Sequence, residues 1–282
     1  MLIKRKSIEK EESSRPAKAA VKTAARKLAP EKPARYKPRF APVTLSEQEG
    51  VRYLHFGTEW VQGAMRIRKP DWPELEYAQQ MMAWMLWNAE PRHIAQLGLG
   101  TATLTKFCYK TFPEAQVTAV ELNPHVIAIC QGMFKLPPND ARLHVLEMDA
   151  LDFVNDAANH GTFDALQVDL YDATARGPVL DSAEFYAACA ACLADDGILT
   201  VNLFGDHPSY AKNIKAMKYA FAQVVSLPEV HDGNVVALAF KRAHKFDPST
   251  LAALEARAKE IHEQTRLPAK SWVKGLAASL DS

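Results

Sequence analysis

The sequence predicts an α/β fold built on a doubly wound, mostly parallel sheet. Short apolar runs of the kind found in buried strands alternate with helix-like runs from residue 93 to residue 222. The first of these runs passes directly into glycine in "HIAQLGLG", as a strand does before a helix in this class of fold. With 282 residues, 48% of them hydrophobic, the chain is long enough to bury one large core and to carry a small accessory unit.

The first 42 residues are strongly basic. They contain 13 Lys and Arg against four Glu and offer almost nothing apolar to bury, so we expect residues 1–42 to form a disordered basic tail. A solvated tail is the favoured interpretation, because no aromatic residue for base stacking occurs before Tyr36. Weak, salt-dependent contacts with an acidic surface or with nucleic acid are the alternative. No apolar run approaches the roughly 18 residues that cross a bilayer, and the N-terminal residues lack the apolar stretch of a secretory signal. We therefore expect a cytoplasmic protein with no membrane contact.

Residues 43–72 change to short β-rich pieces. "VRYLHFG" and "EWVQGAMRI" are separated by a short polar break, and Gly57 ends the first piece, which predicts a small N-terminal unit of β-hairpins. The next stretch, "PELEYAQQMMAWMLWNAE" at residues 73–90, has apolar residues at near-helical spacing after a proline. It predicts one amphipathic helix that leads into the first strand of the large sheet.

The main domain is predicted over residues 73–246. Strands are expected at 93–98, 116–122, 141–148, 163–171 and 197–204, and helices at 103–112, 124–134, 150–158, 183–194 and 209–222. Two final strands, 224–230 and 235–240, are joined by "HDGN" and predict an antiparallel edge. Residues 247–282 are expected to form a C-terminal helical extension that serves packing or association.

The four cysteines include one C-x-x-C pair, Cys189 and Cys192, which could indicate a redox motif or half of a zinc site. The pair lies in an alanine-rich helical pattern, with no second pair and no matching histidine cluster. Small apolar thiols commonly fill helix interfaces. We therefore interpret the cysteines as structural and predict no metal site.

The glycine turn after the first strand of the main domain indicates a nucleoside ligand. Gly98 and Gly100 have no Cβ, so the main chain there can approach a ligand closely, at the sheet edge where ligands of this class of fold bind. Glu121 ends the next strand, about 21 residues after Gly100, where a carboxylate can accept hydrogen bonds from both hydroxyls of a ribose. The alternative is a tight turn beside an exposed glutamate.

Three more carboxylates follow later strands. Asp149 comes after the third strand, where it could accept a hydrogen bond from the exocyclic amine of adenine. Asp169 and Asp172 follow the fourth strand in "DLYDATARGP". This pair suits binding of a cationic substrate, or removal of a proton from an amine that becomes a nucleophile. A structural use of Asp172 as a loop cap is the alternative.

At this point the sequence resembles the spermidine synthase (polyamine aminopropyltransferase) family, a Rossmann-like branch of the class I methyltransferase-like fold. The likeness runs roughly from Gly57 to Lys241. It rests on "GLGTAT", "VELN", "MDAL" and "DLYDATARGP", which are similar in order to the family's glycine-rich turn, strand-end glutamate, Asp-Ala or Asp-Gly pair and D-x-x-D-P-x-G-P loop. "EYAQQM" and the glutamine of "WVQGAMRI" add to the likeness upstream.

The resemblance implies a role for each matching residue. Glu121 would hold the ribose of decarboxylated S-adenosylmethionine, and Asp149 with Ala150 its adenine. Asp169 would be the base that activates a small-molecule amine acceptor such as putrescine. The remaining matches would line the donor and acceptor positions: Gly98, Gly100 and Thr101 in the turn, and Gln62, Tyr77 and Asp172 around the amine. The family requires no metal and commonly forms homodimers, so a homodimer is expected.

The turn also departs from the family's pattern. Thr101 stands where the family has an aspartate that pairs with the donor's amine, and Ala78 stands where it has a histidine near the substrate. Loss of such a charge-assisted contact weakens binding by about 1.5 to 3 kcal/mol. Two alternatives therefore remain open: a methyltransferase that uses ordinary S-adenosylmethionine, although Gln96 stands where an acidic residue would be expected, and a non-catalytic nucleoside-binding protein of the same fold.

Overall fold

A computed structural model describes residues 40–172, 177–230 and 233–280. The expected disordered tail at residues 1–42 lies almost wholly outside the described residues. The described residues form one compact unit, which contains both sheets and the C-terminal helices. The expected boundaries near residues 72 and 246 inside this unit stay predictions. Within the described residues, no helix is both long and apolar enough to span a membrane.

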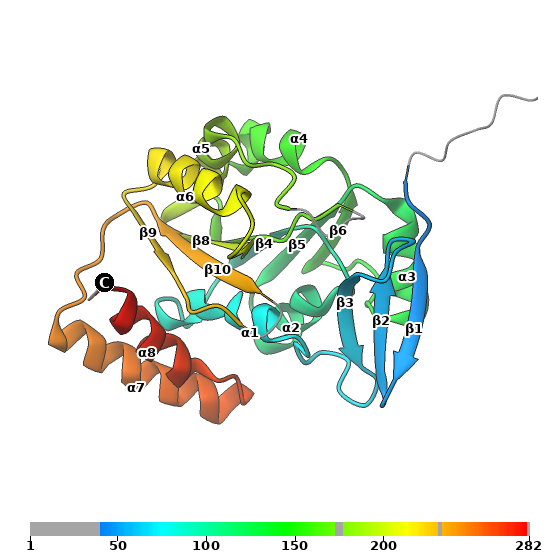
Figure 1. Ribbon diagram of the computed structural model, residues 1–282, viewed down its shortest axis with the longest axis horizontal. Helices are drawn as coiled ribbons and strands as arrows, with labels where there is room; N and C mark the ends of the chain where they lie inside the picture. Colours follow the sequence, from blue (N-terminus) through cyan, green and yellow to red (C-terminus); the bar gives the residue numbers. More distant parts are fainter. Residues whose placement is uncertain (1–39, 173–176, 231–232, 281–282) are drawn as a thin grey trace, which may run out of the picture. The chain divides into compact units, whose positions relative to one another are not determined.

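A small antiparallel sheet precedes the large one (Figure 1). Its strands pair in the order β1-β2-β3. They are β1 (Thr44–Gln48), β2 (Val51–His55) and β3 (Val61–Arg66). A tight turn at Glu49 and Gly50, both with positive φ, joins the first two strands, as hairpin turns commonly require. The predicted hairpin unit is therefore present, with one more strand than the two pieces that were named.

Seven strands among the described residues form the large sheet, in the order β6-β5-β4-β7-β8-β10-β9. All pairs from β6 to β8 are parallel, and β10 runs antiparallel to both of its neighbours. The bounds are β4 (His93–Leu97), β5 (Gln116–Glu121), β6 (Leu143–Glu147), β7 (Phe163–Val168), β8 (Leu193–Phe204), β9 (Gln223–Ser226) and β10 (Asn234–Phe240). The predicted doubly wound fold with an antiparallel edge is confirmed.

Helices cover both faces of this sheet (Figure 1). On one face lie α4 (Ala150–Asn155), α5 (Ala183–Cys192) and α6 (Ser209–Ala220). On the other lie α1 (Glu76–Gln80), the 3-10 turn η1 (Ala83–Leu86), α2 (Thr103–Thr111), α3 (Pro124–Met133), α7 (Pro248–Thr265) and α8 (Ala269–Leu280). A short 3-10 turn, η2 (Ala157–Asn159), follows α4.

The strands supply side chains to two cores in alternation. Along β4, Ile94 faces the core beneath α2 and α3, whereas Ala95 and Leu97 face the core beneath α4 and α5. All three are completely buried. This period of two in strands buried on both faces explains why the sequence shows continuous apolar runs. The sheet is therefore a rigid platform, and only its edges are available for a site.

The expected single helix at residues 73–90 is wrong. The structure has the short helix α1, which ends at Gln80, and then the 3-10 turn η1. The carbonyl oxygen of Met81 accepts hydrogen bonds from Gln167 Nε2 at 2.9 Å and Thr200 Oγ1 at 3.3 Å. Because these side chains of the sheet take the carbonyl that a continuous helix would use, the chain breaks there and buries η1 on all sides.

Candidate active site

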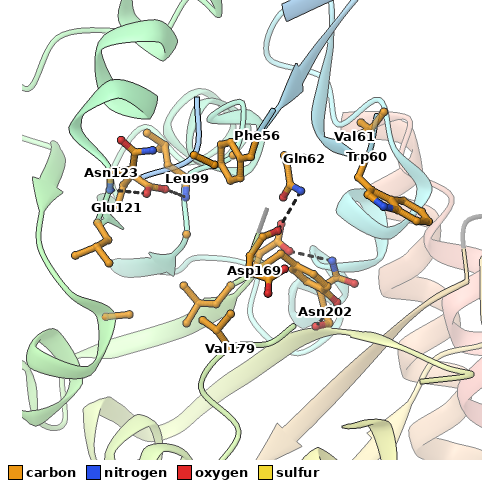
Figure 2. A pocket seen from close by; sticks show the side chains of 18 of the residues that line it. Phe56, Trp60, Val61, Gln62, Leu99, Glu121, Asn123, Asp169, Val179 and Asn202 are labelled. Atoms are coloured by element: carbon orange, nitrogen blue, oxygen red, sulfur yellow. Dashed lines mark hydrogen bonds between the residues drawn. The ribbon is translucent and has the colours of Figure 1, made fainter. Parts of the chain in front are cut away.

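A cavity of about 870 Å³ opens at the carboxyl edge of the large sheet, within the size range of small-molecule sites (Figure 2). The turn after β4, the end of β5 and the segments after β6 and β7 line it from below. The β2–β3 loop and β3 line it from the small sheet. The cavity contains nine of the predicted site residues: Gln62, Tyr77, Gly98, Gly100, Glu121, Asp149, Ala150, Asp169 and Asp172.

Gly98 is required by a very close approach of two main chains. Its φ is 94°, and a Cβ added there would lie 2.1 Å from the carbonyl oxygen of Asp169. The N–H of Gly98 donates to the Val120 carbonyl, and the N–H of Asp169 donates to the Leu97 carbonyl, both at 2.9 Å. Glycine is therefore the residue that lets the turn touch the main chain beside the predicted base.

Glu121 is held by the main chain of this turn. One carboxylate oxygen accepts from the N–H of Leu99 at 3.1 Å, and the other accepts from the N–H of Asn123 at 2.8 Å (Figure 2). Burial raises the pKa of Glu121, and the main-chain hydrogen bonds oppose that rise. Each carboxylate oxygen has a second lone pair, so the carboxylate can also accept hydrogen bonds from a ligand in the cavity.

Asp149 follows β6 and caps α4. Its side chain accepts from the N–H of Leu151 at 2.8 Å, which satisfies one of the first N–H groups of the helix. Apolar residues that line the same cavity include Leu122, Met148 and Ala150. This combination of a carboxylate with apolar side chains suits a flat heteroaromatic group that carries an amine.

Asp169 follows β7, in the part of the cavity next to β8. Asn202 donates to one of its oxygens at 2.9 Å, and the hydroxyl of Tyr77 approaches the other at 3.3 Å. Burial raises the pKa of Asp169, and the hydrogen bonds from Asn202 and Tyr77 lower it. A half-buried carboxylate with a raised pKa and defined partners has the character of a general base.

Gln62 of β3 and Asp172 of the segment after β7 are in contact at the cavity. Asp172 is exposed, and its carbonyl oxygen accepts from Gln62 Nε2 at 3.2 Å (Figure 2). This contact joins β3 of the small sheet to the segment after β7. The residue that follows, Ala173, lies outside the described residues, as does most of the predicted glycine-proline loop.

Residues 77–230 match the spermine/spermidine synthase domain. A polyamine aminopropyltransferase of Chromobacterium violaceum is 31% identical over 235 residues, which cover 83% of this chain and 88% of the relative. The chain belongs to the spermine/spermidine synthase family. Its matched region contains the glycine turn, Glu121 and Asp169, whereas Gln62 lies outside that region.

Solved structures agree with this family in fold. A probable spermidine synthase from Corynebacterium glutamicum superposes with a TM-score of 0.66 at 17% identity, over 86% of this chain and 92% of that one. Human methyltransferase-like protein 13, in complex with SAH, gives 0.58 at 20% identity, over 68% and 93%. The methyltransferase-like fold expected for a spermine/spermidine synthase family member is therefore confirmed.

The structure places Thr101 differently from the other predicted site residues of this family member. Thr101 is 3% exposed and is not among the described residues that line the large cavity. Its hydroxyl lies 3.2 Å from the Ala64 carbonyl oxygen and 2.8 Å from the hydroxyl of Thr103. Thr103 contacts the same carbonyl at 3.1 Å. The side chain at this family position therefore fastens the turn to β3.

The charge of the cavity is one-sided. Five of the described lining residues are carboxylic acids, and no described lining residue is Lys, Arg or His. The acids are Glu59, Glu121, Asp149, Asp169 and Asp172. Such a cavity favours a cationic ligand and disfavours an anionic one.

Sequence reasoning missed Asn202 and Asn234, which line the same cavity. Asn202 lies near the carboxyl end of β8, and a polar residue at that place in an apolar strand is a usable signal. Asn234 begins β10, and its position follows only once β10 is known to run antiparallel.

The cysteine interpretation stays a prediction of packing. All four cysteines are buried and unpaired by disulfide bonds. Burial raises the pKa of the Cys108 thiol and raises that of Cys130 to about 12. Such thiols are unreactive at neutral pH. Among the described residues, no group of three or more His, Cys, Asp or Glu is arranged to hold a metal ion.

Proposed function

We propose that this chain transfers an aminopropyl group from decarboxylated S-adenosylmethionine to a primary amine such as putrescine. The observation that carries the proposal is an acidic cavity, in a member of this family, that joins Glu121 beside the glycine turn to Asp169 after β7. A donor and an acceptor that are both cationic suit a cavity with five lining carboxylic acids.

In this proposal the donor lies over the turn after β4. Gly98 and Gly100 allow the main chain to approach it, and Glu121 accepts hydrogen bonds from the ribose hydroxyls. Asp149 accepts from the adenine amine through the oxygen that does not cap α4, while Leu122 and Met148 contact the ring. Thr101 contributes by holding the turn against β3.

The acceptor amine lies between Asp169 and Asp172, with Tyr77 and Gln62 beside it. Asp169 takes a proton from the amine, and the nitrogen lone pair attacks the donor's propyl carbon beside the sulfonium. As the new C–N bond forms, the C–S bond breaks, and methylthioadenosine leaves with the bonding electrons. Because the sulfonium is already a good leaving group, the protein supplies chiefly positioning and one base.

Replacement of the base tests this proposal. In Asp169→Asn, which keeps the size of the side chain, we expect release of methylthioadenosine from decarboxylated S-adenosylmethionine and putrescine to fall by about 10²-fold or more. Asp152→Asn, an exposed change on α4, is the matched control and should keep full activity. An Asp169→Asn enzyme as active as the control would rule out Asp169 as the base.

The same cavity gives a reason to expect the decarboxylated donor. Ordinary S-adenosylmethionine would bring a carboxylate among five acids, with no basic lining side chain in the described part of the chain to pair with it. Calorimetric titration with each donor should therefore show tighter binding of the decarboxylated one. Tighter binding of the carboxylated donor would instead favour methyl transfer.

A homodimer and a cytoplasmic location complete the proposal. The homodimer comes from the resemblance to the family, and the cytoplasmic location comes from the composition of the sequence. Light scattering of the purified full chain tests the homodimer directly, since a mass near 31.3 kDa would indicate a monomer.

A further inference from the structure

Two asparagine side chains link Asp169 to the antiparallel strand of the sheet. Nδ2 of Asn202 donates to Oδ1 of Asp169 at 2.9 Å, as the dashed line in Figure 2 shows. Nδ2 of Asn234 in turn donates to Oδ1 of Asn202, also at 2.9 Å. Asn202 is 2% exposed and Asn234 is 5% exposed, so both amides have little access to water.

The register of the sheet brings these three residues together. Val168 of β7 pairs with Val201 of β8, so the next residues along, Asp169 and Asn202, lie side by side on the same face. Asn202 stands opposite Val236 of β10, and Asn234 lies two residues before Val236 on that face. Because β10 is antiparallel, its first residue reaches the carboxyl edge where the cavity opens.

A side-chain amide has a donor end and an acceptor end, and the contact with Asn234 holds Asn202 with its donor end facing Asp169. The side-chain NH2 group of Asn234 donates to the amide oxygen of Asn202, so the side-chain NH2 group of Asn202 points to the carboxylate of Asp169. With the opposite orientation, the oxygen of Asn202 would face an oxygen of Asp169, and two acceptors would repel each other.

We propose that Asn234 is a positioning residue that orients Asn202, and through it the carboxylate of Asp169, for proton transfer from the acceptor amine. This inference rests on the proposed role of Asp169 as the base. It goes further, because it assigns to two asparagines of β8 and β10 the task of fixing one carboxylate oxygen. The other oxygen, which Tyr77 approaches at 3.3 Å, then faces the acceptor.

The surroundings of Asp169 are consistent with this task. Tyr171, in the segment after β7, donates its hydroxyl to the main-chain oxygen of Asn202 at 3.0 Å and also hydrogen-bonds Asn234. The titratable side chains around Asp169 are Tyr77 from α1 and Tyr171 and Asp172 from the segment after β7. Three more acids line the same cavity: Glu59 from the β2–β3 loop, Glu121 from β5 and Asp149 from the segment after β6. Burial raises the pKa of Asp169, and the hydrogen bonds donated by Asn202 and Tyr77 oppose that rise.

The test compares pH profiles of Asn234→Asp and Asn234→Leu with the wild type. An aspartate at 234 only accepts, so it competes with Asp169 for the side-chain NH2 group of Asn202 and weakens the hydrogen bond that Asp169 receives. We expect the acidic limb of kcat/KM, which reports the base of the free enzyme, to move up by about one pH unit or more. In Asn234→Leu we expect kcat to fall about tenfold while the donor KM changes little.

Thr200→Val is the matched control. Thr200 is a buried polar residue of β8 whose hydroxyl donates to the Met81 carbonyl at 3.3 Å, not to Asp169. It should change thermal stability and leave the acidic limb in place. If Asn234→Asp does not fold, Asn202→Leu removes the same donated hydrogen bond, and its acidic limb must also move up.

Asp169→Asn, measured alongside, separates the two proposals. If Asp169→Asn is inactive, the acidic limbs of Asn234→Asp and Asn202→Leu coincide with that of the wild type, and Asn234→Leu keeps the wild-type kcat, the positioning role is wrong while the base assignment stands. If Asp169→Asn keeps its activity, the base assignment is wrong and the positioning role falls with it.

Discussion

Restoring the family's aspartate in the glycine turn should damage this protein rather than improve it. Thr101 is almost fully buried, with its hydroxyl 3.2 Å from the Ala64 carbonyl oxygen and 2.8 Å from the Thr103 hydroxyl. A Cβ on Gly63 of β3 would lie 2.8 Å from the Thr101 methyl, so the main chain leaves no room to turn a larger group. In Thr101→Asp, a carboxylate would face the Ala64 carbonyl oxygen from the position of the threonine hydroxyl.

The expected cost follows from these contacts. Loss of the donated hydrogen bond costs about 1 kcal/mol, and an uncompensated buried carboxylate costs about 3 to 5 kcal/mol. Together they predict a loss of about 4 to 6 kcal/mol in the free energy of unfolding. For a folded unit of this size, the melting temperature should fall by roughly 10 to 20 °C. Thr101→Val keeps the shape and should lose only about 1 kcal/mol, because Thr103 still donates to Ala64.

Thermal unfolding followed by circular dichroism measures the melting temperature, and calorimetric titration measures the affinity for decarboxylated S-adenosylmethionine. We expect Thr101→Asp to melt well below Thr101→Val and to bind the donor no more tightly. A Thr101→Asp protein as stable as the wild type, with higher donor affinity, would refute the reasoning. It would mean that the turn is free to present this position to the cavity.

Three further variants examine separate parts of the molecule. Lys106 is 1% exposed, and burial lowers its pKa from 10.5 to about 8, so folding penalises the charged form of its side chain. Lys106→Met removes this penalty, and the stability that it gains over the wild type should be largest below pH 8 and shrink by about 3 kcal/mol towards pH 10.5 in urea titrations. A difference in stability that stays constant with pH would contradict this. Glu121→Gln leaves one acceptor oxygen for the two N–H groups of Leu99 and Asn123 and for the ribose. It should raise the KM for the aminopropyl donor about 10- to 100-fold, with little change in the KM for the acceptor. Equal effects on both substrates would argue against a role of Glu121 in binding the aminopropyl donor. Trp60 lines the cavity, and 59% of its surface is exposed, so Trp60→Ala should leave the melting temperature unchanged. The same change should raise the acceptor KM about two- to fivefold, because a cation–π contact with the acceptor is lost. An unchanged acceptor KM would exclude this contact.

The framework of the site was predictable because it depends on strand ends. Gly98, Glu121 and Asp169 each lie at or just beyond the end of a parallel strand, and parallel strands bring their ends to one edge whatever their side chains do. Their positions therefore followed from strand order alone.

Side-chain direction was not predictable in the same way. The pattern around Thr101 carries no sign that its hydroxyl turns towards β3, because that depends on the Ala64 carbonyl of a separate sheet. Lys106 is in the helix α2, where a lysine normally faces water, yet its ammonium donates to the Phe134 carbonyl at 2.6 Å. The break after Gln80 likewise depends on Gln167 and Thr200, which are about 90 and 120 residues away in sequence.

The contact between Gly98 and the carbonyl of Asp169 has a mechanical consequence. It seats the turn that we propose binds the donor directly on the main chain that carries the proposed base, so a thermal fluctuation that displaces β4 or β7 moves both together. In that proposal, the separation between the reacting carbon and the base changes little when the sheet fluctuates. Changes of length in the loops around the rim would alter which amine enters while leaving that separation as it is.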